Sequence, residues 1–402
     1  MQRKPGNIAV LGSTGTIGLS GLDIVRKNPE KFNVVSLSAN KNVSLLREQI
    51  QEFKPLLVSV SDQSAGEDLK RELGNNGPKV VFGADSAELA VAEPSVHTVL
   101  MAISGYAALK PLLTAIDSDV HIALANKESM VAAGGLVNSK LSTSKSYLIP
   151  VDSEHNSLYQ LLPGAEKKEI RSMTITASGG PFWGLDAEGM KVVTPEQAVK
   201  HPNWDMGAKI SVDSATMINK GLEVIEAVQL FNLPEDRIKV LVHPQSIVHG
   251  MLDFSDGTQT AVLFQSDMRI PIAHALSKLA SDNPKGSPGL RIENSGVDGL
   301  DLAKLQDLRF FQPDNDRFPG LELCREASRI GGLAPCILNA ANEIAVSRFL
   351  AGEIGFTQIV DIARIVGKDL DHLISESGNV LGLAEIENAD AVARKVASEC
   401  VL

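Results

Sequence analysis

The sequence predicts an α/β fold: an N-terminal Rossmann-like parallel sheet, then an α+β middle domain, then a C-terminal helical domain. Three observations support this. The first 150 residues alternate short apolar runs with helical stretches, glycines fill the turn after the first run, and the pattern becomes helical after about residue 310. With 402 residues, the chain is long enough for two or three domains with sizeable cores.

The N-terminal strands are predicted from continuous Val/Ile/Leu-rich runs, which are typical of a parallel sheet buried on both faces. The runs are NIAVLG (7–12), FNVVSLSA (32–39), PLLVSV (55–60), KVVFG (79–83), TVLMAI (98–103) and HIALA (121–125). The apolar region 98–116 has the length of a membrane span, but Gly105, Lys110 and Pro111 interrupt it. We interpret it as a buried strand, a turn and a helix.

The sequence pattern changes after about residue 150. Loops with Gly, Pro and Trp occur between 178 and 207, and longer, more polar strands are expected at 238–243, 248–254 and 258–264. SDNPKGSPG (281–289) resembles a linker, and APCILNAANEIAVSRFL (334–350) predicts a helix. The expected boundaries are 1–150, 151–285, a linker at 286–310, and 311–402.

The composition excludes some classes of partner. The net charge is −11 and no run of Lys or Arg stands out, so neither nucleic acid nor an anionic membrane is an expected partner. Cys324, Cys336 and Cys400 are too few and too scattered for a disulfide framework or a zinc site, which fits a reducing compartment. No signal peptide is readable at the N-terminus.

The first chemical signal is AVLGSTGTIG (9–18), in which Gly12, Gly15 and Gly18 lie between the first strand and the first helix. Glycines there allow a tight turn and a close approach to a pyrophosphate at the helix N-terminus. The spacing is not the commoner G-x-G-x-x-G, and strand-to-helix turns use Gly in any case. Its position at the first junction favours a dinucleotide.

The end of the second strand, SLSANKN (36–42), indicates which dinucleotide. NAD sites usually have an acid there for the ribose hydroxyl, whereas this chain has Lys41 and no acid. A cation favours a 2′-phosphate and therefore NADPH. The alternative is that Lys41 is a solvated loop lysine.

IPVDSEHNS (149–157) places two carboxylates one residue apart. In an extended strand Asp152 and Glu154 project to one side, and Ser153 and His155 to the other, which argues against a local Ser–His–acid triad. Two oxygen ligands suit Mg²⁺ or Mn²⁺. A solvated loop or a helix N-cap explains these residues equally well, and His155 is better explained as a hydrogen-bonded structural histidine.

A third carboxylate is available in SVDSATMINKGLEVIEA (211–227). If this stretch is helical beyond Ser214, then Asn219, Lys220 and Glu223 share one face. The simple explanation is a Lys220–Glu223 ion pair. The alternative is that Asn219 and Lys220 hold a phosphate while Glu223 completes a metal site, with Ser214 capping the helix or donating to the phosphate. ASGGPF (177–182) offers further backbone donors to an anion.

These motifs resemble the 1-deoxy-D-xylulose 5-phosphate reductoisomerase family, which acts in isoprenoid precursor biosynthesis. The resemblance covers nearly the whole chain. The matching motifs, in the family's order, are GSTGTIG (12–18), ANKES (125–129), PVDSEHN (150–156), SGGPF (178–182), HPNW (201–204), SVDSATMINKGLE (211–223), HPQSIVH (243–249) and LNAANE (338–343).

The resemblance implies roles for individual residues. NADPH would contact Thr14, Gly15, Thr16, Ile17, Asn40, Lys41, Asn42, Asn126, Glu128 and Gly207. A divalent metal, Mg²⁺ or Mn²⁺ with Co²⁺ able to substitute, would bind Asp152, Glu154 and Glu223. The substrate would contact Lys127, Ser153, Glu154, Ser178, His201, Ser214, Asn219, Lys220 and Glu223. The catalytic set would be Lys127, Asp152, Glu154, Glu223, His201, Trp204 and His249. Many members have Gly where this chain has Asn40, so the 2′-phosphate pocket is expected to differ in detail.

The implied reaction is the NADPH-dependent rearrangement and reduction of an α-hydroxy ketone phosphate, in which a metal acts as a Lewis acid and a template. Two rival functions remain: an NADPH-dependent dehydrogenase of another small phosphorylated or hydroxy-acid substrate, and a dinucleotide sensor without catalysis. The resemblance also implies a homodimer. A cytoplasmic location is expected, or a plastid one if a transit peptide has been removed.

Both tryptophans, Trp183 and Trp204, fall in the Gly- and Pro-bearing stretch 179–207. No periodic apolar pattern surrounds either one, so we expect a mobile lid over bound substrate rather than a core. In this hypothesis Trp204 covers the reacting carbons and His201 reaches polar oxygens. Residues 183–193 match no motif with a known role.

Overall fold

The computed structural model describes residues 6–74, 77–163, 165, 169–280, 295–305, 307–376, 378 and 381–401. The chain divides into two compact units. Unit 1 comprises Met1–Asn126, Ser139–Asn156 and Asp267–Asp298, and unit 2 comprises Lys127–Asn138, Ser157–Ser266 and Gly299–Leu402. The expected linker at 286–310 lies partly outside the described residues, and the expected three-domain division stays a prediction.

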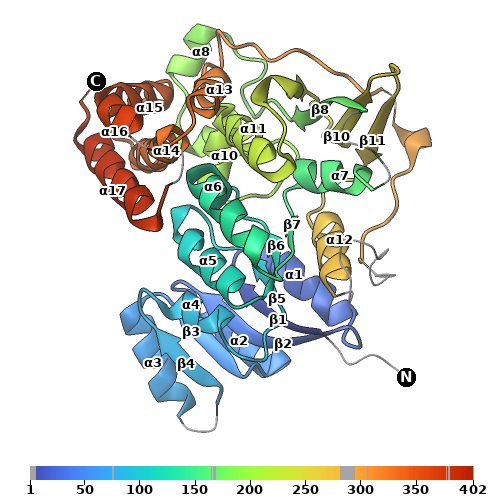
Figure 1. The fold of residues 1–402 in the computed structure, drawn as a ribbon, viewed down its shortest axis with the longest axis vertical. Helices are drawn as coiled ribbons and strands as arrows, with labels where there is room; N and C mark the ends of the chain where they lie inside the picture. Colours follow the sequence, from blue (N-terminus) through green and yellow to red (C-terminus); the bar gives the residue numbers. More distant parts are fainter. Residues whose placement is uncertain are drawn as a thin grey trace. The chain divides into compact units, whose positions relative to one another are not determined.

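Unit 1 is built on a seven-stranded sheet in the order β4-β3-β2-β1-β5-β6-β7, with every pairing parallel (Figure 1). The predicted buried parallel sheet is therefore confirmed. The strands are β1 (Gly6–Leu11), β2 (Phe32–Ala39), β3 (Leu57–Val60), β4 (Lys79–Phe82), β5 (Thr98–Met101), β6 (His121–Leu124) and β7 (Leu148–Pro150). β1 lies at the centre of the sheet, and its last four residues, Ile8 to Leu11, are almost completely buried.

The helices of unit 1 follow from local signals. α2 begins where Asn42 accepts a hydrogen bond from the Leu45 N–H, and α3 begins where Asp62 does the same for Ala65. The helices are α1 (Thr16–Lys27), α2 (Val43–Phe53), α3 (Gln63–Leu73), α4 (Ser86–Val91), η1 (Tyr106–Ala108), α5 (Leu109–Asp117) and α12 (Arg269–Leu279). The apolar region 98–116 forms β5, η1 and most of α5, as predicted. Among the described residues, no helix is long and apolar enough to cross a membrane.

Two helices contain residues of both units: α6 (Glu128–Thr143) and α7 (Ser153–Leu161). Of the alternatives left open for this stretch, the extended strand is wrong, because the chain does not continue as a strand after Pro150, and the start of a helix is correct. The chain turns into a helix at Ser153, so Glu154 lies in the first helical turn. A carboxylate at that position is favoured by the helix dipole.

Unit 2 contains a four-stranded mixed sheet in the order β11-β10-β8-β9 and a group of C-terminal helices (Figure 1). The strands are β8 (Ile170–Ala177), β9 (Ile238–Val242), β10 (Val248–Phe254) and β11 (Gln259–Leu263). The helices are α8 (Ala187–Lys191), α9 (Pro195–Ala198), α10 (Ala208–Ala215), α11 (Ile218–Phe231), η2 (Glu235–Arg237), η3 (Leu302–Lys304), α13 (Gly320–Ile330), α14 (Ala334–Leu350), α15 (Gln358–Asp369), α16 (Asp371–Glu376) and α17 (Leu383–Glu399).

The stretch 211–227 is two helices rather than one. α10 ends at Ala215 and α11 begins at Ile218, because Met217 adopts a left-handed conformation with φ of 61°. Ser214 lies inside α10, so of its two alternatives the helix cap is wrong and the phosphate contact stays a prediction. Asn219, Lys220 and Glu223 still share one helical face, as predicted.

Candidate functional site

The glycine turn of unit 1 is shaped by close backbone approach. Gly12 has φ of 80°, and a Cβ there would lie 2.4 Å from the Ala102 carbonyl oxygen. A Cβ at Gly18 would lie 2.2 Å from the Gly12 carbonyl oxygen. Neither position therefore accepts a side chain, which explains two of the three glycines of the motif.

The turn leads into α1, which begins at Thr16 with Gly15 as its N-cap. No side chain caps this end and its first turn holds no acidic residue, which is the arrangement of a helix N-terminus suited to an anion. The Gln49 side chain stabilises the turn through two hydrogen bonds with Ser13. It accepts from the Ser13 hydroxyl at 2.7 Å and donates to the Ser13 carbonyl at 2.9 Å. No local sequence pattern indicates this role of Gln49.

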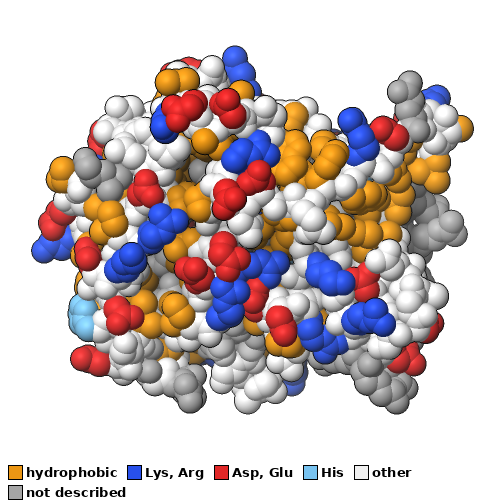
Figure 2. Space-filling model, turned by 90° about the horizontal axis from the view of Figure 1, so that it is seen from above, with side chains coloured by type: hydrophobic (Ala, Val, Ile, Leu, Met, Phe, Trp, Pro, Cys, Tyr) orange, Lys and Arg blue, Asp and Glu red, His pale blue; other side chains and the backbone are white. Residues whose placement is uncertain are grey.

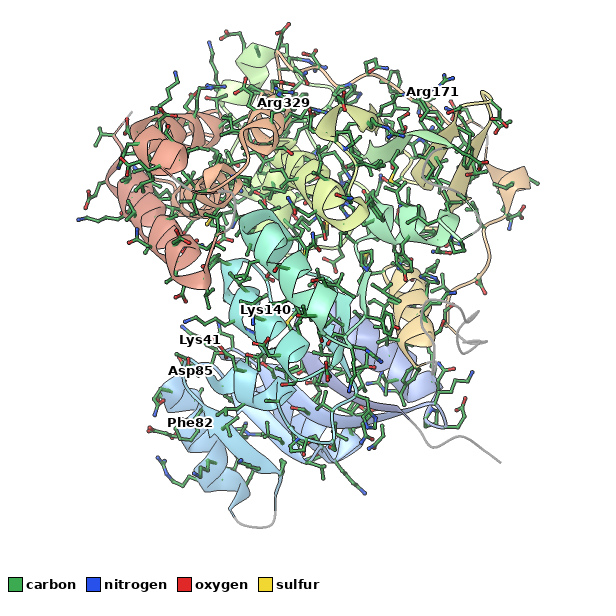
Figure 3. All side chains as sticks on the ribbon, viewed as in Figure 1. Lys41, Phe82, Asp85, Lys140, Arg171 and Arg329 are labelled. Carbon is green, nitrogen blue, oxygen red and sulfur yellow. The ribbon has the colours of Figure 1, made fainter. Side chains whose placement is uncertain are left out.

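Asn40, Lys41 and Asn42 follow β2 and are all exposed. Lys41 lies on the outside of the ribbon (Figure 3). The Asn42 side chain caps α2 at 3.2 Å from the Leu45 nitrogen, so part of its hydrogen-bonding capacity serves the helix. The other predicted amide, Asn126, is buried at the end of β6 and donates to the carbonyls of Ile103 and Gly105 at 3.0 and 2.9 Å.

The acidic pair of unit 1 lies at the start of α7. The Asp152 carbonyl accepts from the Asn156 N–H at 2.8 Å, and the Asn156 amide donates to the Pro150 carbonyl at 2.7 Å. The Ser153 hydroxyl donates to the Glu154 carboxylate. These bonds fix the turn that presents both carboxylates at the amino end of the helix.

In unit 2, polar side chains converge on Glu223, which is 1% exposed. Lys127 donates to Glu223 Oε1 at 2.9 Å and to Asn219 Oδ1 at 3.0 Å. The Asn219 amide donates to the same Oε1 at 2.6 Å, and Lys220 forms an ion pair with Oε2. The simple Lys220–Glu223 pair is therefore present, but as part of a buried group with two cations and one carboxylate.

A second polar group in unit 2 contains Ser178 and His201. His201 Nδ1 accepts from the N–H groups of Asn203 and Trp204 at 3.2 and 3.0 Å, so the ring proton is on Nε2, which donates to Ser178 Oγ at 2.7 Å. Burial and the charge of Lys220 lower the pKa of His201 to about 4, so the ring is neutral at pH 7.

The SGG turn after β8 contacts α10. Gly179 and Gly180 both have positive φ, and a Cβ at Gly180 would lie 2.8 Å from the Ser214 carbonyl oxygen. The Gly180 N–H donates to Ser178 Oγ at 3.1 Å. Ser178, Ser214, His201 and Lys220, which are far apart in the sequence, are thus brought to one part of unit 2.

Trp204 packs edge-on against His249, with ring centroids 6.1 Å apart. His249 is 2% exposed, stacks on Phe264 at 3.8 Å and contacts the Phe264 carbonyl through Nε2 at 3.1 Å. The buried His249 ring is therefore a packing surface for Trp204. Asn203, which sequence reasoning missed, ties the same segment to the β9–β10 turn through Pro244 O at 2.6 Å and Ser246 Oγ at 2.8 Å.

Trp183 belongs to a different environment. It stacks on Phe318 with centroids 5.9 Å apart, and the Arg317 guanidinium lies 5.3 Å from its ring. Arg317 also donates to the carbonyls of Trp183 and Leu185 at 3.0 and 2.7 Å. The partners are over 130 residues away in the chain, so local sequence could not reveal this anchoring. The stretch 179–207 also contains α8 and α9 and is not one continuous loop.

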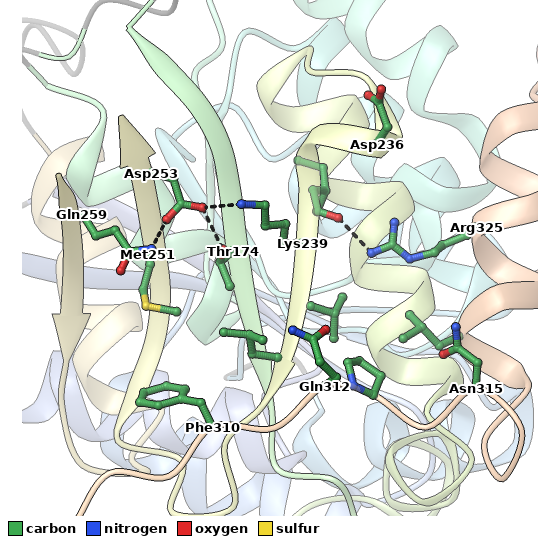
Figure 4. Close-up of a pocket in the computed structure, with 15 residues that line it drawn as sticks. Thr174, Asp236, Lys239, Met251, Asp253, Gln259, Phe310, Gln312, Asn315 and Arg325 are labelled. Atoms are coloured by element: carbon green, nitrogen blue, oxygen red, sulfur yellow. Dashed lines mark hydrogen bonds and ion pairs between the residues drawn. The ribbon is translucent and has the colours of Figure 1, made fainter. Parts of the chain in front are cut away.

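Unit 2 also contains a hollow of about 640 Å³ on one face of the small sheet (Figure 4). None of the residues predicted for the site lines it. Lys239 and Asp253 pair with each other at 3.1 Å there, and Asp253 also accepts from Ser172 at 2.6 Å. The hollow therefore shows polar groups that are already satisfied, beside Phe310 and Met251.

Unit 1 has a parallel sheet, an uncapped, glycine-rich entry to α1 and a lysine in place of the usual acid, and unit 2 has buried lysines and carboxylates. These features define a dinucleotide-dependent oxidoreductase. Three family models match the chain. They describe 1-deoxy-D-xylulose 5-phosphate reductoisomerase over residues 8–134 and two C-terminal domains of that enzyme over 148–231 and 263–396. The chain belongs to the 1-deoxy-D-xylulose 5-phosphate reductoisomerase family.

Relatives agree over the full length. The chain is 47% identical over 390 residues to 1-deoxy-D-xylulose 5-phosphate reductoisomerase of Chlorobium chlorochromatii, covering 97% of this chain and 98% of that protein. A crystal structure of DOX-P reductoisomerase with NADPH, fosmidomycin and magnesium is 38% identical, with a TM-score of 0.91 and 98% of each chain covered. The Zymomonas mobilis enzyme in complex with NADPH is 40% identical, with a TM-score of 0.85 and 98% of each chain covered.

Proposed function

We propose that this protein converts 1-deoxy-D-xylulose 5-phosphate to 2-C-methyl-D-erythritol 4-phosphate, using NADPH and a divalent metal, as a step in isoprenoid precursor biosynthesis. Family membership over the full chain supports this. The observation that carries it at the level of residues is the group in unit 2 that joins Lys127, Asn219 and Lys220 to Glu223. A rearrangement that develops negative charge on substrate oxygens needs cations at fixed positions.

The phosphate of the substrate would be held by Ser178, Ser214, Asn219 and Lys220. Ser178 Oγ accepts from His201 and from the Gly180 N–H, so its hydroxyl proton can be donated to a phosphate oxygen. Neutral His201 fixes that orientation. Because the phosphate is remote from the reacting carbons, its binding energy can be used to position them.

The metal would be held by Asp152, Glu154 and Glu223, and Ser153 would contact the substrate. The donor set fits: all are carboxylates, which suit Mg²⁺ or Mn²⁺ and also accept Co²⁺. Glu223 already accepts hydrogen bonds from three side chains, which would orient it toward a cation. When bound, the metal supplies a Lewis acid for the carbonyl and hydroxyl oxygens. Lys127 would contribute a second positive charge close to these oxygens.

NADPH would contact the glycine turn at Thr14 to Ile17, and its 2′-phosphate would lie near Lys41. The uncapped amino end of α1 fits a pyrophosphate. Asn40, Asn42, Asn126, Glu128 and Gly207 complete the proposed contacts. When bound, NADPH supplies a hydride to the rearranged aldehyde.

The test is an assay of purified protein with NADPH, Mg²⁺ and 1-deoxy-D-xylulose 5-phosphate, following loss of nicotinamide absorbance and identifying the product by mass spectrometry. Metal-dependent turnover is expected. Turnover unaffected by chelation would favour an NADPH-dependent dehydrogenase of another small substrate, and NADPH binding without turnover would favour a sensor. We place the activity in a bacterial cytoplasm, with a plastid as the alternative.

We further propose a homodimer that uses the open face and edge of the small sheet. β11 is an edge strand whose residues are mostly exposed. Phe310 and Phe311 are 39% and 42% exposed near the hollow of Figure 4. On the face shown in Figure 2, apolar side chains gather in one area, and charges of both signs are spread over the rest. Unprotected edges and apolar patches favour association.

The dimer is tested by light scattering after size-exclusion chromatography. The wild type should have twice the mass of the chain, and Leu263→Lys should shift it toward monomer, because it places a charge on the edge strand. Leu89→Lys, at an exposed leucine of unit 1, is the control. A monomeric wild type would contradict the homodimer, and a dimeric Leu263→Lys protein would contradict this face.

A further inference from the structure

Lys209 is the second residue of α10, and α10 follows directly after the lid segment, which we define as His201–Gly207. Its Nζ lies 2.8 Å from Glu128 Oε1 and 2.8 Å from Asp213 Oδ2. The other oxygen of Asp213 accepts from the Asn342 amide at 2.8 Å. One lysine thus links α6, α10 and, through Asp213, α14.

The groups that Lys209 links are buried, Lys209 itself is partly buried, and their charges depend on one another. Asp213 and Asn342 are 1% and 0% exposed. Burial opposes the charge of Lys209, but Asp213 and Glu128 outweigh it and raise the pKa of the ammonium. Burial likewise opposes ionisation of Glu128, yet Lys209 holds the pKa of this carboxyl below its usual value. Removing the lysine would leave two carboxylates without their cation, which is costly at buried positions.

Glu128 is also the neighbour of Lys127 in the chain. Lys127 is held by Asn219 and Glu223 of α11, whereas Glu128 is held by Lys209 of α10. Two consecutive side chains are therefore fixed by two different helices, at the first turn of α6. A displacement of Glu128 moves the backbone that carries Lys127.

We propose that Lys209 is a positioning residue, which ties the end of the lid segment to the first turn of α6 and so fixes the Lys127 ammonium for the reaction. This inference rests on the proposed function, in which Lys127 contacts the substrate. In this proposal Lys209 is not itself a contact of the substrate or the cofactor. Its effect is transmitted through Glu128 on one side and through the start of α10 on the other.

The test compares Lys209→Met, Lys209→Arg and Lys200→Met. Lys200 is exposed and lies just before the lid segment, so its variant makes the same change of charge at the other end of the lid. For each protein, kcat and KM for 1-deoxy-D-xylulose 5-phosphate are measured with saturating NADPH and Mg²⁺. The dissociation constant of NADPH and the melting temperature are measured separately. Should Lys209→Met not fold, Lys209→Gln replaces it.

In Lys209→Met we expect kcat to fall about 100-fold, the scale of a displacement of about 1 Å in a reacting group. NADPH affinity should fall less than kcat, because Glu128, which Lys209 holds, is one of several proposed NADPH contacts. Lys209→Arg should recover most of kcat, because a guanidinium can reach both carboxylates. The melting temperatures show whether a loss of stability accompanies the change in kcat. Lys200→Met should match the wild type.

Two results would overturn the inference in an active wild type: Lys209→Met with the kcat of Lys200→Met, or Lys209→Arg as impaired as Lys209→Met. A wild type without turnover contradicts the proposed function instead, and the inference falls with it.

Discussion

Glu223 has polar contacts on both of its carboxylate oxygens. Its two carboxylate oxygens accept from Lys127, Asn219 and Lys220, and the side chain is buried. A carboxylate between two ammonium groups cannot be replaced by an amide without leaving cations poorly compensated. The residue therefore serves the architecture of unit 2 as well as the proposed metal.

Glu223→Gln should lower turnover by about 100- to 1,000-fold, because charge stabilisation at the reacting oxygens is lost. NADPH binding should survive, since the glycine turn is in unit 1. Metal binding can be followed without activity, by electron paramagnetic resonance of Mn²⁺, and should weaken. Glu196→Gln, at an exposed glutamate of α9, is the control. Unchanged Mn²⁺ affinity in Glu223→Gln would remove Glu223 from the ligand set.

Lys41→Asp should reduce the preference for NADPH over NADH by about 10- to 100-fold, which is the range expected from losing one charged hydrogen bond. An aspartate would repel the 2′-phosphate and could accept from a ribose hydroxyl. The measurement is the ratio of kcat/KM for the two cofactors. Lys145→Asp changes an exposed lysine elsewhere in unit 1 and should leave the ratio unaltered. An equal ratio in Lys41→Asp and wild type would contradict the assignment.

Among the elements, the stretch 179–207 differs most from its prediction. Its two tryptophans were both expected in a lid, yet Trp183 is anchored by Arg317 and Phe318, while Trp204 rests on His249. The lid hypothesis therefore concerns His201–Gly207, and Trp183 provides an internal reference.

Substrate added to the metal- and NADPH-loaded protein should change the tryptophan emission. Trp204→Phe should abolish most of this change, because Trp204 is in the lid segment. Trp183→Phe should lower the total emission and retain the change. The measurement is emission corrected for nicotinamide absorption. If the ligand-dependent signal disappeared with Trp183 instead, the lid segment as defined here would be wrong.

Elements with a strong local pattern could be predicted from the sequence. The helix at 334–350 and the strands 238–243, 248–254 and 258–264 lie where they were expected. Two local features could not be. No glycine marks the break at Met217, and the residues after Pro150 fitted a strand, a loop or a helix N-cap, so that the helix start at Ser153 was not singled out. Both depend on contacts made in the folded chain.

The same limit applies to the candidate site. Residue types such as Asp, Glu and Lys at short spacing indicated a metal and a phosphate. The structure brings Ser178 and His201 to the same part of unit 2 as the helical face of Asn219, Lys220 and Glu223. Hydrogen-bond partners that are far apart in the sequence leave no local pattern. Examples are Gln49 with the glycine turn and Lys209 with Glu128.

At the scale of the whole molecule, several histidines are kept neutral by burial. Burial lowers the pKa of His201 and of His274 to about 4, and lowers that of His121 and His243 as well. Between pH 6.5 and about 4 the unfolded chain binds more protons than the folded one. The free energy of unfolding should therefore decrease as the pH falls through this window.

The urea midpoint should be lower at pH 5 than at pH 7, and His274→Gln should reduce that difference, because its side chain no longer titrates. His372→Gln, at an exposed histidine of α16, is the control and should retain the full difference. The measurement is urea unfolding followed by circular dichroism at both pH values. A His274→Gln protein with an undiminished pH difference would contradict this account.

Unit 1 depends on a helix encoded far from the rest of it. α12 packs against α1 and β6, and Arg269 pairs with Asp23 at 3.2 Å. On the ribosome, α12 follows the end of β7 by more than one hundred residues, which at roughly 5–20 residues per second is a delay of roughly 10 s. During that interval the nascent sheet has its other helices but lacks α12, so the apolar surface it will cover stays accessible to chaperones. In a protein made of the N-terminal 150 residues alone, α12 would be absent, and this apolar surface would stay uncovered.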